Sequence, residues 1–260
     1  MPEPVRRIAV FVQKQAEAVA DARRRLDELA RSLGVETVED GAQLAVVLGG
    51  DGTMLRALRR FLGTGVPVIG VNYGRVGFLT SVVADEMAPT LERVLRGEYR
   101  TYELPTLEAT LGGERHVAVN DVVSTSGSLG RMVELGWSVG GEDLGVLPCD
   151  GLVCATPSGS TAYNLSSGGP VLVWGLDACA LTFVAPHSLH ARPLVVPRSR
   201  DVVVTNRTAD VPVTVVADGA EIGRLEPGER VEIRLGEAWS LLATPSDVSF
   251  FDRYRATFAS

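Results

Sequence analysis

A glycine-rich turn with the sequence GGDGT, residues 49–53, separates an apolar run at residues 44–48 from a helical pattern that begins near Met54. Glycines allow a ligand to approach the backbone closely, and the first N–H groups of a helix attract phosphate. Asp51 would repel a phosphate unless a divalent cation lies between them, or unless its carboxylate accepts a proton from a nucleophile. Both roles indicate phosphoryl transfer. The simpler alternative is that Asp51 only caps the helix.

A second glycine cluster, NYGRVGFLT at residues 72–80, follows the apolar run that ends at Val71. It lacks the first glycine of the G-x-G-x-x-G fingerprint because Asn72 occupies that position, which disfavours a hydride-transfer dehydrogenase of the Rossmann type. A tight turn that buries Phe78 and Leu79 is the competing interpretation.

A third cluster, residues 150–170, carries seven hydroxyl side chains within the twelve positions from Thr156 to Ser167. Such an array can donate hydrogen bonds to ribose or phosphate oxygens. It contains no G-x-S-x-G motif, and His187 and His190 have no required spacing to its serines, so a serine hydrolase is disfavoured. Turns stabilised by serine and threonine hydroxyls would account for two or three of these residues.

The composition excludes further classes. The chain of 260 residues has a formal net charge of −7, and Lys14 is its only lysine. No Gly-Lys pair exists, so a Walker A loop is excluded, and the single lysine disfavours Schiff-base catalysis. The acidic balance disfavours nucleic-acid partners. The longest apolar stretch, residues 170–186, carries Asp177 and is too short to span a membrane.

Three cysteines and the absence of a secretory pattern predict a reduced, cytoplasmic protein. Cys179 lies near His187 and His190 in the sequence, but the second ligand pair of a zinc site is missing, so we expect no zinc.

Apolar periodicity predicts an α/β protein. Residues 8–12, 44–48 and 67–71 are continuous apolar runs, typical of parallel strands covered on both faces, and helical patterns fall between them. From about Tyr102 the chain consists of short segments rich in Val, Thr and Gly, including a strand expected at residues 116–123 and a hairpin turn at Asp218-Gly219. We therefore expect an N-terminal α/β domain with a mainly parallel sheet, residues 1–100 with residues 245–260 returning to it, and a β-rich C-terminal domain at residues 101–244.

Taken together, the clusters resemble those of the NAD kinase family, which transfers a phosphoryl group from ATP to the adenosine-ribose 2′-hydroxyl of NAD. GGDGT alone is shared with diacylglycerol-type lipid kinases. The combination that selects the family consists of these segments: N-x-G-R-x-G-F-L at 72–79, Asn120-Asp121, Asp150-Gly151, TPSGSTAY at 156–163, and PHSLxxRPL at 186–194. One departure is that the family usually has Asn-Glu where this chain has Asn120-Asp121.

The resemblance implies that Asp51 is the catalytic carboxylate, linked to a metal or acting as general base. The residues that it implies for NAD and ATP binding are Gly50, Gly52, Thr53, Phe78, Asn120, Asp121, Asp150, Ser158, Thr161, Ala162 and Tyr163. It also implies ATP as phosphoryl donor, Mg²⁺ or another divalent cation, and assembly as a homodimer or homotetramer, with neither nucleic acid nor membrane as partner.

Two alternatives stay open from the sequence. A lipid kinase would need an apolar acceptor groove, against which the hydroxyl-rich third cluster argues. A sensor that binds NAD(P) without catalysis has a single feature of the sequence in its favour, the shortened carboxylate of Asp121.

The solitary lysine yields a first prediction. An ATP-using enzyme without a phosphate-binding lysine must hold phosphates with backbone amides, a helix start, a cation and arginine. We predict that Lys14→Arg retains NADP formation from NAD and ATP, measured as turnover of the purified protein. Abolished activity in the variant would show that Lys14 itself is essential.

Overall fold

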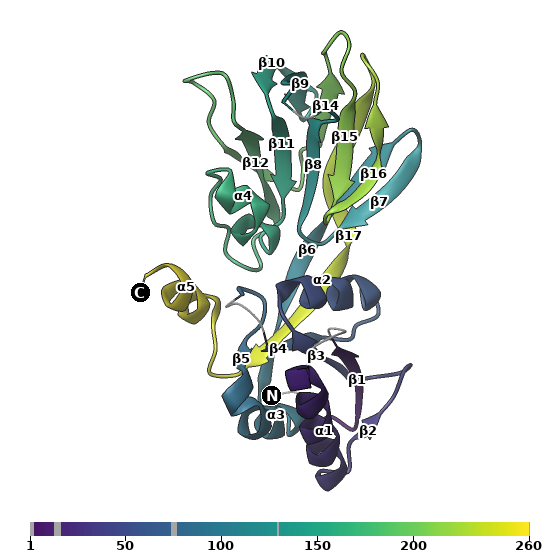
Figure 1. Ribbon diagram of the computed structural model, residues 1–260, viewed down its shortest axis with the longest axis vertical. Coiled ribbons are helices and arrows are strands. Elements are labelled where there is room, and N and C mark those ends of the chain that lie inside the picture. The colour runs from purple at the N-terminus through teal and green to yellow at the C-terminus, as the bar shows by residue number, and fades with distance from the viewer. Residues whose placement is uncertain (1–2, 13–16, 74–76, 129, 260) are drawn as a thin grey trace. The chain divides into compact units, whose positions relative to one another are not determined.

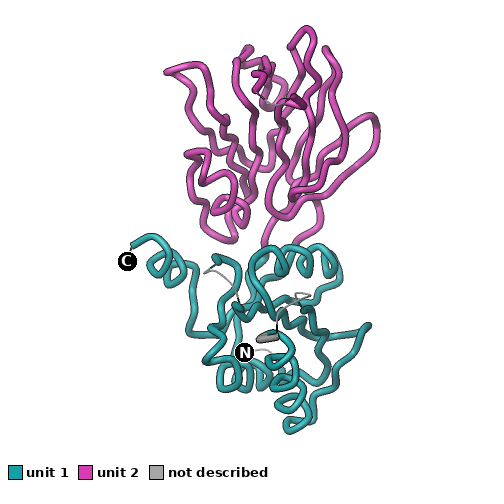
Figure 2. The backbone as a smooth tube through the Cα atoms, viewed as in Figure 1, with its two compact units in different colours: residues 1–103, 240–260 teal, residues 104–239 magenta. Residues whose placement is uncertain are grey.

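The computed structural model describes residues 3–12, 17–73, 77–128 and 130–259. Two compact units emerge, the first comprising residues 1–103 and 240–260 and the second residues 104–239 (Figure 2). Both boundaries fall inside long strands, β6 (Tyr99–Leu111) and β17 (Arg230–Pro245).

The first unit is built on a parallel sheet with the strand order β2-β1-β3-β4, and β5 continues it beside β4. Its elements are β1 (Arg7–Val12), α1 (Glu17–Ser32), β2 (Glu36–Thr37), β3 (Leu44–Gly49), α2 (Asp51–Arg60), β4 (Val68–Asn72), β5 (Val82–Val83), η1 (Ala84–Glu86), α3 (Met87–Leu95) and α5 (Phe250–Phe258). The last part of β17 joins this sheet, where Leu242 pairs in parallel with Val68.

Helices cover both faces of the parallel sheet, as the continuous apolar strands predict (Figure 1). On one face, Leu26 of α1 and Leu91 of α3 pack in a fully buried cluster with strand residues such as Ile69. On the other face lies α2, whose Met54 approaches Gly70 so closely that a Cβ there would stand 2.6 Å from the methionine sulfur. Gly70 therefore lets α2 sit tightly on β4.

The second unit contains two mainly antiparallel sheets with a shared core. One has the order β10-β9-β14-β17, with β6 and β7 beside β17, and the other the order β13-β12-β11-β8-β15-β16. Their elements, besides β6 and β17, are β7 (Glu114–Ala118), β8 (Asp121–Ser126), β9 (Val133–Val139), β10 (Glu142–Cys149), β11 (Gly151–Ala155), η2 (Gly159–Thr161), α4 (Tyr163–Ser166), β12 (Ala178–Val184), β13 (Leu194–Pro197), β14 (Val202–Asn206), β15 (Val213–Ala217) and β16 (Ala220–Leu225). Leu135 and Ile233 from one sheet meet Leu152 and Leu181 from the other in a single buried cluster.

The predicted fold class, an N-terminal α/β part with a mainly parallel sheet and a β-rich C-terminal part, is confirmed. Two local predictions are wrong. The helix after the glycine-rich turn begins at Asp51 rather than near Met54. The strand expected at residues 116–123 is two strands, β7 and β8, because the chain leaves one sheet for the other at Val119 and Asn120.

A buried amide ties the two sheets of the second unit together. Asn206, at the end of β14, is fully buried and donates from Nδ2 to the carbonyl oxygens of Val211 (2.9 Å) and Leu225 (3.0 Å). Its Oδ1 accepts from the N–H of Thr208 at 2.9 Å.

We predict that Asn206→Ala lowers the free energy of unfolding by about 2–4 kcal/mol, because two carbonyls and one N–H lose the hydrogen bonds that the buried amide makes to them. Urea denaturation measures this change. Asp210→Asn serves as the contrast, since it weakens an ion pair with Arg131 whose side chains are 67% and 55% exposed, and it should cost less than about 1 kcal/mol. Equal effects of the two substitutions would contradict the role of Asn206.

Candidate functional site

The start of α2 is lined by glycines that leave space. Gly50 is the N-cap residue with φ −102°, and no side chain caps this helix among the described residues. A Cβ added at Gly50 or at Gly52 would meet nothing within 4 Å. Neither glycine has a left-handed φ, so neither backbone turn nor internal packing demands it. What the two glycines provide is open space beside the first turn of the helix, where the N–H groups of Thr53 and Met54 donate to the carbonyl oxygen of Gly50.

Asp51, between these glycines, accepts hydrogen bonds from a distant loop rather than from its own helix. Its Oδ2 accepts from the N–H of Phe78 at 2.6 Å, and the N–H of Leu79 lies 3.2 Å from both carboxylate oxygens. Its Oδ1 also accepts from the N–H of Thr80 at 3.2 Å and from the Thr80 hydroxyl at 3.3 Å. The idea that Asp51 caps α2 is therefore wrong: the carboxylate organises residues 78–80.

The approach of this loop to Asp51 requires a glycine. A Cβ on Gly77 would stand 2.1 Å from Oδ1 of Asp51, well inside van der Waals contact. The neighbouring residues Gly74 and Arg75, and also Lys14, lie outside the described residues.

Thr53 and Phe78, both predicted as ligand contacts, are buried, with 5% of each residue exposed. The Phe78 ring packs edge-on against Phe250, with centroids 5.4 Å apart, and stacks on Phe258 at 6.0 Å. The side chain of Phe78 thus faces α5, and its backbone faces Asp51.

A second carboxylate organises a loop in the second unit in the same way. Asp218 accepts from three consecutive N–H groups, those of Val119 (2.8 Å), Asn120 (2.7 Å) and Asp121 (3.3 Å). Its own N–H donates to the carbonyl oxygen of Asp121 at 3.0 Å. Asp218 has φ +49° in the β15–β16 hairpin, a conformation that aspartate tolerates better than most residues.

This arrangement presents the side chains of Asn120 and Asp121 at the start of β8. The side-chain oxygen of Asn120 is buried and accepts no hydrogen bond from any residue that the structure describes. A buried acceptor left without a donor costs about 1–3 kcal/mol, a cost that any group donating to this oxygen would remove. Burial, reinforced by the negative charge of Asp218, raises the pKa of Asp121 to about 6.

Most hydroxyls of the third cluster shape the loop instead of facing outward. The hydroxyls of Thr156 and Ser158 both donate to the carbonyl oxygen of Val119, at 2.6 and 2.9 Å. That of Ser160 donates to Pro157 and accepts from the N–H of Leu172. Thr156, Ser158 and Ser160 are essentially inaccessible. Three of the seven hydroxyls are therefore not exposed to a ligand, and the hydroxyl of the predicted contact Ser158 instead holds the carbonyl of Val119, the residue before Asn120.

The next three predicted residues, Thr161, Ala162 and Tyr163, are the more exposed part of this loop. Thr161 is half-buried, Ala162 is exposed, and Tyr163 at the start of α4 is 43% exposed. Gly159 allows the loop to lie against Asn120, between β7 and β8, because a Cβ there would stand 2.0 Å from the carbonyl oxygen of Asn120.

Asp150 is not brought together with these residues. Ala155 at the end of β11 pairs with Asp121, whereas Asp150 precedes the first residue of β11, about 16 Å away along the strand. Asp150 is exposed, and within the chain it lies at the opposite end of β11 from Asn120 and Asp121.

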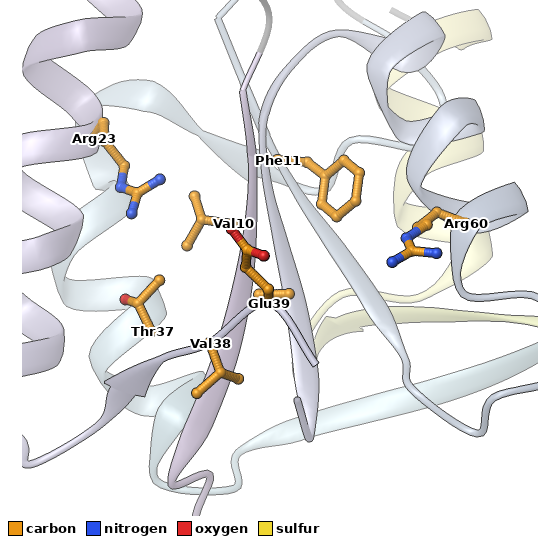
Figure 3. Close-up of a pocket in the computed structure, with 8 residues that line it drawn as sticks. Val10, Phe11, Arg23, Thr37, Val38, Glu39 and Arg60 are labelled. Carbon is orange, nitrogen blue, oxygen red and sulfur yellow. The ribbon is translucent and has the colours of Figure 1, made fainter. Parts of the chain in front are cut away.

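A separate pocket of about 470 Å³ lies beside residues 9–11 of β1, and none of the predicted site residues lines it (Figure 3). Its two arginines already have acidic partners: Arg23 pairs with Asp27 at 2.9 Å, and Arg60 lies 3.9 Å from Asp40. The side chains of both pairs are at least 35% exposed, and Glu39 also lines the pocket.

Metal and membrane features can be stated for the described part of the chain. Within it, no group of three or more His, Cys, Asp or Glu side chains could hold a metal ion. Among the same residues, no helix has the length and apolar character needed to cross a membrane. Cys149, Cys154 and Cys179 are free and buried, and burial raises the pKa of each thiol, to about 12 for Cys149 and Cys179.

The fold and these loops define a class: a two-unit protein whose α/β part carries a glycine-lined helix start of the kind that binds phosphate, and whose β-rich part presents a preformed polar loop. Models of the ATP-NAD kinase N-terminal domain and C-terminal domain match residues 7–99 and 119–242.

Relatives agree. The chain is 38% identical over 253 residues to the NAD kinase of Heliobacterium modesticaldum, covering 95% of this chain and 84% of the relative. It is 36% identical to that of Syntrophotalea carbinolica, covering 96% and 87% of the two chains. The protein therefore belongs to the ATP-NAD kinase family, and it is a kinase.

Solved structures show the same fold. The structure of Archaeoglobus fulgidus NAD kinase in complex with ATP has a TM-score of 0.77 at 27% identity, covering 97% of both chains. Yeast NADH kinase complexed with NADH has a TM-score of 0.82 at 22% identity, covering 99% of this chain and 88% of the yeast chain.

The raised pKa of Asp121 makes a prediction about stability. A carboxyl group whose pKa is higher in the folded than in the unfolded protein destabilises the fold as it ionises, so the cost is absent below about pH 4 and complete above about pH 6. We predict that Asp121→Asn is more stable than the wild type near pH 7, by up to about 3 kcal/mol, and that the difference shrinks as the pH falls towards 4.

Urea denaturation over this pH range measures the difference, and Asp150→Asn provides an exposed carboxylate of the same unit as control. A difference between wild type and Asp121→Asn that does not change with pH would contradict the prediction.

Proposed function

We propose that this protein transfers the γ-phosphoryl group of ATP to the 2′-hydroxyl of the adenosine ribose of NAD, giving NADP and ADP. Family membership supports the reaction class. The observation that carries the assignment to a site is the carboxylate of Asp51, fixed at the glycine-lined start of α2 by three consecutive N–H groups.

In this mechanism, Asp51 accepts the proton of the ribose hydroxyl. A hydroxyl is a poor nucleophile near pH 7, and a positioned base is worth about 10²–10⁴-fold. The atom best suited to take the proton is Oδ1, because its contacts, at 3.2 to 3.3 Å, are longer than the 2.6 Å bond that Oδ2 accepts from Phe78. The Thr80 hydroxyl can rotate away from Oδ1 without any movement of the backbone.

The helix start of α2 is proposed to hold the phosphates. The positive end of its dipole and the open space at Gly50 and Gly52 suit the close approach of phosphate oxygens. The described residues fit no resident metal cluster, and both oxygens of Asp51 already accept hydrogen bonds. We therefore propose that Mg²⁺ or another divalent cation is held mainly by the phosphate oxygens of ATP, where it neutralises their charge.

The second unit is proposed to supply contacts to NAD. The unpartnered oxygen of Asn120 can accept from an amide or amino group, and the carboxylate of Asp121 can accept from ribose hydroxyls. Thr161, Ala162 and the exposed ring of Tyr163 offer a further surface for a nucleoside.

The remaining expectations are kept as proposals. These are the two domains at residues 1–100 with 245–260 and at 101–244, assembly as a homodimer or homotetramer, and a cytoplasmic location. The two compact units support the domain division.

We predict that the purified protein forms NADP from NAD and ATP, and that Asp51→Asn lowers kcat at least about 100-fold while the protein stays folded. Coupled spectrophotometric detection of NADP measures turnover, and circular dichroism reports the fold. Asp40→Asn is the matched control, because the Asp40 side chain is 95% exposed.

Normal turnover of Asp51→Asn would disprove the role of Asp51. Tight NAD binding by the wild type without turnover would instead identify a dinucleotide sensor, an alternative favoured by the number of hydrogen bonds that Asp51 already accepts.

A further inference from the structure

The loop that donates its N–H groups to Asp51 is held on its carbonyl side by an arginine from α5. The guanidinium of Arg253 donates from Nη2 to the carbonyl oxygen of Gly77 and from Nε to that of Phe78, the latter at 3.4 Å. Arg253 and Phe78 are 175 positions apart in the sequence.

These contacts share peptide groups with those of Asp51. The carbonyl of Gly77 and the N–H of Phe78 belong to one peptide group, and the carbonyl of Phe78 and the N–H of Leu79 belong to the next. Each group therefore accepts from the cation of Arg253 and donates to the anion of Asp51. Hydrogen bonds in such a chain polarise one another and strengthen.

The position of Arg253 is itself fixed by the fold of α5. A capping box formed by Ser249 and Asp252 sets where this helix begins. Phe250, 4% exposed, and Phe258 pack on the ring of Phe78.

Arg253 is itself half-buried. Burial lowers the pKa of its guanidinium, and the negative charge of Asp51 acts in the opposite direction. Removing a guanidinium from water is costly unless it is paired and hydrogen-bonded, and the two carbonyls together with Asp51 provide that compensation.

We propose that Arg253 is a positioning residue: by holding the carbonyls of Gly77 and Phe78, it keeps the following N–H groups aimed at Asp51 and so orients the carboxylate. This inference rests on the proposed function, in which that carboxylate accepts the substrate proton. An error of about 1 Å in a catalytic group can cost about 100-fold in rate, so the effect of losing Arg253 should fall on kcat.

The chain offers a matched control on the same helix. Arg255 is two residues further along, its side chain is 71% exposed, and it pairs with Asp252 of α5. Arg255→Met removes a guanidinium from α5 without touching the loop.

The experiment compares Arg253→Met, Arg253→Lys and Arg255→Met with the wild type. Arg253→Met should lower kcat about 10- to 100-fold, with KM values for ATP and NAD within about threefold of the wild type. Arg253→Lys keeps the charge but not the planar fork, so its kcat should be intermediate. Arg255→Met should behave as the wild type.

Hydrogen–deuterium exchange of the segment containing residues 78–80 gives a readout that does not depend on turnover. We expect faster exchange in Arg253→Met than in Arg255→Met, because the loop loses its carbonyl partner. If Arg253→Met fails to fold, Arg253→Lys decides by the same two measurements.

Two results would overturn the inference: a folded Arg253 variant with wild-type kcat and exchange, or one with a raised KM for ATP at unchanged kcat, which would make Arg253 a phosphate contact. Absence of NADP formation by the wild type would refute the proposed function instead, and the exchange measurement would still test the hold of Arg253 on the loop.

Discussion

A carboxylate that accepts hydrogen bonds from consecutive backbone N–H groups is the interaction on which both loops of this protein depend. Asp51 fixes residues 78–80, and Asp218 fixes residues 119–121. Hydrogen bonds to an ionised acceptor are roughly twice as strong as those between neutral groups. Each loop therefore has a defined shape without regular secondary structure and can present its remaining polar groups to a ligand with little ordering cost.

Glycines make these interactions sterically possible. Gly77 admits the Asp51 carboxylate, and Gly159 allows the loop after β11 to lie on the carbonyl oxygen of Asn120. Gly50 and Gly52 have the opposite role, since the space beside them is empty. The same residue type thus allows a close internal contact in one place and leaves open space in the other, and only the surroundings distinguish the two.

Local patterns in the sequence predicted the fold class, the parallel strands of the first unit and the turn at Asp218-Gly219, because each depends on residues close together in the chain. They failed where the outcome depends on distant partners. The loop bonded to Asp51 lies 27 to 29 residues away, and the carbonyl that accepts from Ser158 lies 39 residues away. The sequence gives one weak indication of the role of Arg253: it is a cation three residues after Phe250, on the apolar side of a short aromatic helix. Its hydrogen-bond partners are about 175 residues away in the sequence, so the pattern does not identify them.

The discontinuity of the first unit has a consequence for synthesis on the ribosome. The whole second unit, residues 104–239, is translated between the turn that carries Asp51 and the helix that carries Arg253. The strand segment around Leu242, which pairs with β4, also emerges only then. A nascent chain that has exposed only the first hundred residues therefore holds Asp51 and its donor loop, but neither the last strand nor the arginine that supports the loop. The two chain segments of the first unit can complete their shared sheet only after the second unit has been translated. The first unit therefore begins to be synthesised before the second unit but can complete its fold only after it.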